Sequence, residues 1–249
     1  MVDVSRATYV LLPPSESKEP GGRVRAAPGL FDDVLATARR DVLAALAPVL
    51  ASAPEDFARV ANVRGALLER ARVATDLLVA GRAPTLPAWR RYNGVVWSHL
   101  DAASLSPAQR RRLLIPSALY GLNCGTDEVA EYRLTMKVRL GDLGPLSAFW
   151  RPHLVRALDL VGRATIVNLL PKEHAAAIGD ASDLTARMVT VGFVRHDGEG
   201  VAGHDAKAAK GVVGRLVVTQ GLAALDGFRW RGWRASRQGD DYQVRAPRH

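Results

Sequence analysis

Lysine is scarce in this chain, and its few copies lie in short polar segments. Only five of the 34 basic residues are lysines: Lys18 in PPSESK, Lys137 in YRLTMK, Lys172 in NLLPKEH, and Lys207 and Lys210 in AKAAKG. An ammonium is a compact charge whose pKa shifts readily on burial, whereas a guanidinium stays charged. The pattern suggests that several of these lysines line one site. The alternative is that five residues are distributed by chance.

Polar residues near three of the lysines complete a candidate anion-binding site. Lys207 and Lys210 are three residues apart and share one face of a helix, where two like charges attract an anion or lower each other's pKa. Arg133 could bind a phosphate or carboxylate through two parallel hydrogen bonds. The predicted binding residues are Ser15, Ser17, Arg133, Asn168, Lys207 and Lys210, and the predicted catalytic residues, if the protein is an enzyme, are Lys18, Glu16, Glu173 and Lys210. A structural network of salt bridges is the alternative.

A glycine turn at Asn93-Gly94 marks a second candidate site. A chain that passes through glycine into a helix exposes backbone N–H groups that can bind a phosphate oxygen. Neighbouring arginines add an attraction that does not depend on nucleotide sequence. The predicted DNA-contacting residues are Arg90, Arg91, Asn93, Gly94, Arg110, Arg111 and Arg112. The alternative is a plain connector between two helices, because Asn-Gly is common in turns.

The charge balance favours partners that carry negative charge. A net charge of +9 and a pI near 10.3 predict binding to double-stranded DNA or to a phosphorylated or otherwise anionic small molecule. An evenly solvated, arginine-rich surface is the alternative. No apolar run reaches the length of a membrane span, so we expect no membrane association. The single cysteine, Cys124, excludes an intramolecular disulfide and fits a cytoplasmic location.

Other residues carry weaker chemical signals. Cys124 could be a peroxide-sensitive thiol, but a lone cysteine is more often inert. His174 could act as a general base, and Trp230 and Trp233 could stack on bases or anchor the core. Iron binding by His196, Asp197, His204 and Asp205 would require their glycine-rich loop to fold back. Histidine, cysteine and carboxylates otherwise stand apart, so we predict no metal site and no cofactor.

Alternating strands and helices must position these residues. We expect strands within TYVLLPP, ATIVNLL, RMVTVGFV and the C-terminal tail, and one buried strand in LLIPSALYGL that ends at Gly121. We expect helices over 31–50, from a capping box at Ser52 toward Leu78, in two pieces around Asn93-Gly94, over 106–112, in LSAFWRPHLVRALDLVG and after Lys207. Residues 15–18 follow a strand end, where α/β folds often place ligand loops. We predict one α/β domain over residues 1–249.

Six motifs in this order resemble the YaaA family, also called DUF328 or UPF0246, of bacterial peroxide-stress proteins. They are LLPPSESK; RYNGVVW; SALYGL followed by Asp127 and YRLTM; Phe149-Trp150; Asn168-Leu169 with Glu173; and AKAAKG. The resemblance spans residues 9–244, and the order and spacing of the motifs make it specific. In departures from the family pattern, His174 replaces a common tyrosine and Lys210 a common arginine.

The resemblance implies a mixed α/β fold with a central mixed sheet, flanking helices, a positively charged cleft and a helix-hairpin-helix element near residues 84–100, an arrangement called the cantaloupe fold. It also implies DNA binding and protection against hydrogen peroxide by limiting damage from unincorporated iron. No established reaction comes with it, so the resemblance leaves open whether the protein is an enzyme.

Two functions of different classes follow. A DNA-associated stress protein predicts a basic groove that connects residues 89–96 with residues 110–112, and duplex binding that weakens with salt. An enzyme acting on a nucleotide, nucleobase or other anionic small molecule predicts that Lys18, Lys207 or Lys210 meets Glu16 or Glu173 in a closed pocket, with a strongly shifted pKa. The sequence names neither a substrate nor an oligomeric state.

Overall fold

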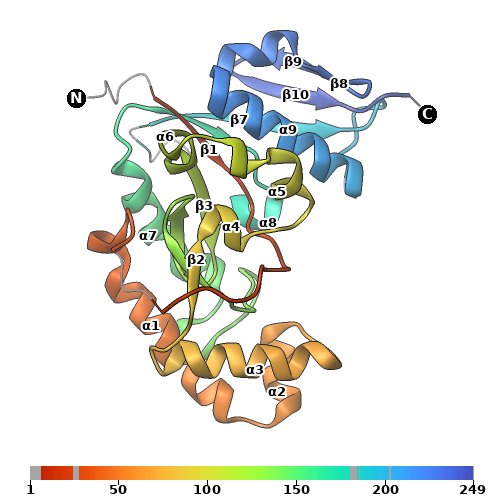
Figure 1. Ribbon diagram of the computed structural model, residues 1–249. Coiled ribbons are helices and arrows are strands. Elements are labelled where there is room, and N and C mark those ends of the chain that lie inside the picture. Colours follow the sequence, from red (N-terminus) through yellow and green to blue (C-terminus); the bar gives the residue numbers. More distant parts are fainter. Residues whose placement is uncertain (1–6, 25–27, 180–183, 185, 202, 249) are drawn as a thin grey trace.

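A mixed β-sheet forms the centre of the computed structural model, which describes residues 7–24, 28–179, 184, 186–201 and 203–248 (Figure 1). Within these residues the sheet has eight strands in the order β4-β3-β1-β6-β7-β10-β9-β8. Their bounds are Thr8–Leu11 (β1), Leu113–Ser117 (β3), Gly121–Cys124 (β4), Thr165–Asn168 (β6), Arg187–Val194 (β7), Arg229–Trp230 (β8), Trp233–Gln238 (β9) and Asp241–Arg245 (β10). A separate antiparallel pair joins β2 (Thr85–Pro87) to β5 (Glu128–Ala130).

Strand β1 occupies the position where the order of the strands reverses. It pairs in parallel with β3 on one side and with β6 on the other, and Leu11 at its end lies opposite both Leu114 and Asn168. Pro13 and Pro14 follow at once, and proline lacks the N–H that a continuing central strand would need. In α/β sheets such a switch point leaves space for ligands beyond the carboxyl ends of the strands. The segment 15–18 begins at this edge.

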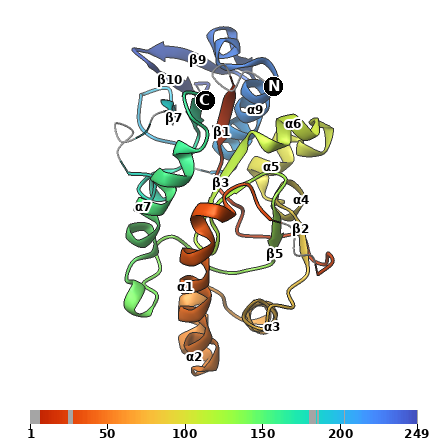
Figure 2. The same ribbon diagram turned by 90° about the vertical axis from the view of Figure 1, so that its left-hand side faces the viewer.

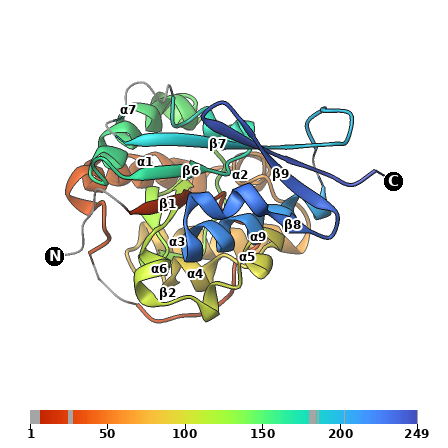
Figure 3. The same ribbon diagram turned by 90° about the horizontal axis from the view of Figure 1, so that it is seen from above.

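Helices cover both faces of the sheet. Viewed from above, α7 lies on one side of β6 and β7, while α9 and α5 lie on the other (Figure 3). The helix bounds are Asp32–Ala51 (α1), Pro54–Ala61 (α2), Ala66–Val79 (α3), Ala88–Arg91 (α4), Val95–Leu100 (α5), Pro107–Arg111 (α6), Leu146–Asp159 (α7), Lys172–Ala175 (α8) and His204–Gln220 (α9), with 3-10 turns at Ala102–Ser104 (η2), Gly141–Leu143 (η3) and Leu222–Gly227 (η5). The fold is therefore the predicted single mixed α/β domain.

The close packing of α9 against α5 fixes the position of Lys207 and Lys210. A Cβ at Gly211 would lie 2.3 Å from the carbonyl oxygen of Val96, so only glycine allows the two backbones to approach this closely. One turn further along, Gly214 contacts Leu12 and Leu169, which follow β1 and β6. Lys207 and Lys210 precede this contact in the first turns of α9 and therefore lie toward the carboxyl edge of the sheet.

The predicted helix from Ser52 to Leu78 is wrong in two respects. It divides into α2 and α3, because Asn62 and Gly65 adopt positive φ angles of 52° and 56°. The predicted capping box is absent as well, since the Ser52 hydroxyl donates to the Val49 carbonyl at the end of α1. Both helices lie at one end of the molecule, opposite β9 and β10 (Figures 1 and 2). They pack around a small apolar cluster of their own, which includes Phe57 and Ala71.

The segment LLIPSALYGL forms a hairpin in place of the predicted single strand. It divides into β3 and the antiparallel β4, and the Ser117 side chain stabilises the turn by accepting from the N–H groups of Leu119 and Tyr120. Gly121 has a φ of +70°, and the ring of Trp150 leaves no room for a Cβ there. The other predicted elements are present, including the short helix that Ser106 and Gln109 cap reciprocally. No described helix combines the length and apolar character needed to cross a bilayer.

Candidate functional site

The structure joins the segment after β1 to the glycine turn between α4 and α5. The Ser15 hydroxyl accepts a hydrogen bond from the N–H of Asn93 at 3.2 Å, and the Asn93 amide donates to Glu19 at 3.3 Å. A Cβ at Gly94 would lie 3.1 Å from the Cβ of Ser15. Lys18 forms an isolated antiparallel bridge with Tyr92. Two segments that the sequence suggested as separate sites are therefore in direct contact.

Lys18 is buried at this junction without a carboxylate partner among the described residues. Its ammonium donates to the carbonyls of Ser15 at 3.0 Å and Glu16 at 3.5 Å. It lies 4.0 Å from the ring centroid of Tyr132 and 5.7 Å from that of Tyr92. Only 7% of Lys18 is exposed, whereas Glu16 and Ser17 are exposed. An aromatic face stabilises a cation but compensates for its desolvation only in part.

The protonation of Lys18 reflects these surroundings. Burial, assisted by the positive charge of Arg133, lowers the pKa of Lys18 from 10.5 to about 7. The nearby Glu131 carboxylate opposes this shift but is already paired with Arg70 at 2.7 Å. The Arg133 guanidinium makes no hydrogen bond within the described part of the chain. A half-deprotonated amine beside an uncommitted guanidinium can bind an anion and exchange a proton with it.

A network of hydroxyl groups that was not predicted from the sequence holds the ring of Tyr132 in place. Tyr132 receives a hydrogen bond from Ser117 at 2.8 Å, and its hydroxyl lies 3.1 Å from that of Tyr92. Burial raises the pKa of Tyr132 to about 12, so this residue stays protonated and acts as a neutral wall. Both tyrosines belong to motifs already identified, RYNG and YRLTM. Their position within these polar motifs is the sequence signal that could have identified the two tyrosines as site residues.

The remaining predicted ligand residues gather in a second cluster around α8 and the first turns of α9. The Lys210 ammonium lies 5.3 Å from the ring centroid of Phe193 in β7, and burial, then the charge of Lys207, lowers its pKa to about 8. Glu173 forms an ion pair with Lys137 at 2.9 Å. Partial burial lowers the pKa of half-buried His174, and the charges of Glu173, Lys210 and Lys137 act on it as well. Lys137 was not among the predicted site residues.

Asn168 has a local structural role at the end of β6. Its side-chain oxygen accepts from the N–H of Leu170 at 3.0 Å, and its amide group lies 3.8 Å from the sulfur of Met188. The side chain is buried. It shapes the turn that leads into α8.

The described contacts of Lys18 and of Lys210 involve different neighbours. The charges that shift the pKa of Lys18 are those of Arg133, Glu131, Arg91 and Glu16, and those of Lys207 and Lys210 are not among them. We therefore describe the lysines as two clusters, one around Lys18 and one around Lys210. The segment from Arg133 to the Lys137–Glu173 pair runs from the first cluster to the second.

Arg91 is unsuited to the predicted DNA contact, because it is completely buried. Its guanidinium donates to the carbonyls of Val129 at 2.9 Å, Gly21 at 2.9 Å and Pro84 at 3.0 Å, and to that of Glu19. These bonds tie α4 to β5 and to the segment after β1. We therefore assign Arg91 a structural role.

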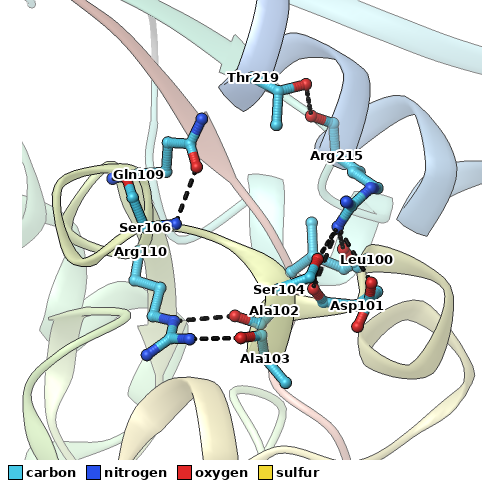
Figure 4. Close-up of polar contacts among 10 residues, drawn as sticks. All are labelled: Leu100, Asp101, Ala102, Ala103, Ser104, Ser106, Gln109, Arg110, Arg215 and Thr219. Carbon is cyan, nitrogen blue, oxygen red and sulfur yellow. Dashed lines mark hydrogen bonds and ion pairs between the residues drawn. The ribbon is translucent and has the colours of Figure 1, made fainter.

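Two further arginines of the predicted DNA surface donate hydrogen bonds to backbone carbonyls. Arg110 donates to the carbonyls of Ala102 at 2.8 Å and Ala103 at 2.6 Å (Figure 4). Its guanidinium also stacks 4.0 Å from the ring centroid of Trp89. Arg112 donates to Val218 at 2.8 Å. By contrast, Arg90 and Arg111 are exposed and make no side-chain hydrogen bond within the described residues.

A cavity of about 340 Å³ lies beside the glycine turn. Trp89, Arg90 and Asn93 contribute to its lining, but so do the carboxylate-bearing residues Glu19 and Asp101. Asp101 is paired with Arg215 at 3.3 Å, across the turn drawn in Figure 4. The predicted continuous basic groove is thus interrupted by acidic residues at this point.

Two of the weaker candidates, Cys124 and Trp233, have structural roles. Cys124 is buried, its thiol lies 3.0 Å from Asp127, and burial together with that carboxylate raises the pKa of Cys124 to about 12. Trp233 is buried beside Phe193. No group of three or more histidine, cysteine or carboxylate residues in the described part of the chain could hold a metal ion.

Comparison with known proteins supports the resemblance noted from the motifs. The model of a family described as "Peroxide stress protein YaaA" matches residues 9–238. The chain belongs to the YaaA family. A UPF0246 protein of Streptomyces coelicolor is 35% identical over 223 residues, which cover 86% of this chain and 84% of that protein. A UPF0246 protein of Corynebacterium glutamicum is 32% identical over 215 residues, with 84% of each chain covered. The residues of both lysine clusters lie within the matched range of this YaaA-family chain.

Proposed function

We propose that this YaaA-family protein binds an anionic small molecule beside the carboxyl ends of β1 and β6, and that the Lys18 amine reacts with it as a base or a nucleophile. The observation that carries the proposal is the burial of Lys18 over the Tyr132 ring without a carboxylate partner among the described residues. An amine in such surroundings is unfavourable for stability, and shifted groups of this kind concentrate at functional sites.

Each neighbouring residue has a role in this proposal. Arg133 binds the anionic group of the ligand. The Ser15 carbonyl accepts from the Lys18 ammonium at 3.0 Å, and the Ser15 hydroxyl is held by the N–H of Asn93. Glu16 and Ser17 are exposed and contact the ligand at the entrance to the site. We assign no proton transfer to Glu173, because its carboxylate is paired with Lys137.

Trapping with glyoxylate, a small anionic aldehyde, tests the proposal. The neutral amine attacks the aldehyde carbon, water leaves, and cyanoborohydride reduces the imine to a stable secondary amine that mass spectrometry locates. At pH 7 the neutral fraction of an amine with a pKa near 7 is roughly a thousandfold larger than that of an ordinary lysine. Lys18 should therefore be modified at least about tenfold faster than exposed Lys172. Equal rates would refute the proposal.

DNA binding is a second candidate function, favoured by two exposed arginines near the glycine turn. Arg90 precedes Asn93-Gly94, and Arg111 follows Arg110, whose guanidinium contacts Trp89 of α4. With a net charge of +9, this surface would attract duplex DNA without regard to sequence. The affinity should fall steeply between 50 and 200 mM salt. Undetectable or salt-insensitive binding would remove this candidate.

Protection from unincorporated iron is the cellular role that accompanies the DNA-binding candidate. It predicts that cells lacking the gene are more sensitive to hydrogen peroxide, and that a cell-permeable iron chelator restores their survival. Sensitivity that the chelator leaves unchanged would contradict this role. Complementation with an Arg90→Ala, Arg111→Ala double variant then tests whether protection depends on the exposed arginines.

A further inference from the structure

The cluster around Lys210 contains polar groups that have no partner among the residues that the structure describes. Within the described residues, the Lys210 ammonium has neither a hydrogen-bond nor an ion-pair partner, and its aromatic contact is the Phe193 ring at 5.3 Å. The Nδ1 atom of His174 is buried and likewise has no hydrogen-bond partner there. Buried polar atoms are normally paired with protein, water or a bound group, so these two groups are candidates for contact with a ligand.

The neighbouring carboxylate does not neutralise this cluster. Glu173 lies beside His174 but binds Lys137 at 2.9 Å. Lys207, three residues before Lys210 on the same helix, adds a second positive charge. Both lysines occupy the first turns of α9, where the helix dipole favours anions over cations. The cluster therefore combines several features that attract an anion.

We propose that Lys207, Lys210 and His174 form a binding site for a phosphate-like oxyanion, such as the terminal phosphate of a small metabolite. Lys210 supplies the charge from within the site, Lys207 supplies it from the exposed rim, and the imidazole of His174 contributes a hydrogen bond. The proposal rests on the proposed function, because the oxyanion is then a second anionic group of the molecule that meets Lys18 at the same edge of the sheet.

A terminal phosphate fits this site better than a phosphate of the DNA backbone. A terminal phosphate carries close to two negative charges and exposes three oxygens. A backbone phosphate carries one charge and has a sugar on each side. Lys210 is partly buried against Phe193 and His174 is buried at Nδ1, so a flanked phosphate is less able to approach both groups.

The test follows the imidazole nitrogens of His174 by NMR while inorganic phosphate is added to protein labelled at its six histidines. The signal of His174, assigned with the His174→Gln variant, should shift in a saturable manner. Lys210→Met should weaken phosphate binding at least about tenfold, because it removes a charge-assisted hydrogen bond. Lys172→Met removes the same charge from an exposed position on α8 and should change the affinity less than about twofold.

The outcomes separate this inference from the proposed function. An unchanged His174 signal, or equal losses in Lys210→Met and Lys172→Met, would overturn the oxyanion site. So would a His174 shift that appears with unphosphorylated duplex DNA but not with inorganic phosphate. Glyoxylate trapping at Lys18 depends on neither result and tests the proposed function alone. Thermal unfolding without phosphate gives a further check, because Lys210→Met removes an unpaired ammonium and should raise the Tm.

Discussion

The Lys18 ammonium lies 4.0 Å from the ring centroid of Tyr132, a contact that joins the segment after β1 to the segment after β5. The ring stabilises the cation, while burial and the charge of Arg133 oppose it. Burial dominates, so the amine is close to half protonated at neutral pH. A lysine held in this state lowers the stability of the folded protein but can serve in proton transfer.

Lys18 should make stability depend on pH in a predictable direction. Its pKa is about 7 in the folded protein and near 10.5 in the unfolded chain. Between these values the unfolded state binds the additional proton, so the free energy of unfolding rises with pH, by up to about 5 kcal/mol from this residue. Lys18→Met should therefore be more stable than the wild type at pH 6 and lose that advantage by about pH 10.

Urea unfolding of the wild type and Lys18→Met across this range measures the effect. Lys172→Met is the matched control, since it removes an exposed lysine and should leave the pH profile of the wild type unchanged. Parallel pH profiles for all three proteins would show that Lys18 titrates as an ordinary lysine.

Arg91 should be essential for stability. Arg91→Met leaves several buried carbonyls without a donor, among them those of Val129 and Pro84, and should lower the free energy of unfolding by at least about 3 kcal/mol. The neighbouring variant Arg90→Met removes an exposed side chain and should cost less than about 0.5 kcal/mol. Similar losses for the two variants in urea unfolding would contradict the structural role of Arg91.

If the protein binds DNA, the exposed arginines should account for part of the salt dependence. Arg90→Ala and Arg111→Ala should each reduce the slope of log affinity against log salt concentration by about 0.9. Arg40→Ala removes an exposed arginine on α1, outside the predicted DNA surface, and should leave the slope unchanged. Fluorescence anisotropy with a labelled duplex provides the slopes. Equal slopes for all three variants would exclude the surface around the glycine turn.

Cys124 should resist peroxide in the folded protein. Burial and Asp127 raise the pKa of Cys124 to about 12, so the reactive thiolate is nearly absent at neutral pH. Mass spectrometry after treatment with hydrogen peroxide should find this thiol unoxidised, whereas the urea-unfolded chain should react. Rapid formation of sulfenic acid in the native protein would restore Cys124 as a candidate sensor.

The sequence predicted the elements whose patterns are local. Apolar spacing located α1, α7 and α9, and the Ser106-Pro107 cap located the start of α6. It failed at two turns, one that depends on a distant residue and one that depends on local backbone angles. The turn after Ser117 requires Trp150 to pack on Gly121, and the break between α2 and α3 depends on Asn62 and Gly65 adopting positive φ angles. Neither feature has a periodic signal.

The sequence predicted residues for the candidate site but not their arrangement in space. Motif order identified Lys18, Arg133 and Lys210, but spacing could not show that the lysines form two clusters. Arginine runs were misleading for a related reason. Arg91, Arg110 and Arg112 look like a DNA-binding surface in the sequence, yet each satisfies backbone carbonyls that only the folded chain brings within reach.

A direct NMR titration of the Lys18 amine tests the central claim. With five lysines in the chain, the side-chain ¹³Cε and ¹⁵Nζ signals can be assigned by single lysine substitutions and followed from pH 5 to pH 11. The structure predicts a midpoint for Lys18 near pH 7. A midpoint above pH 10 would mean that Lys18 is an ordinary charged lysine, and the proposed role of its amine would fail.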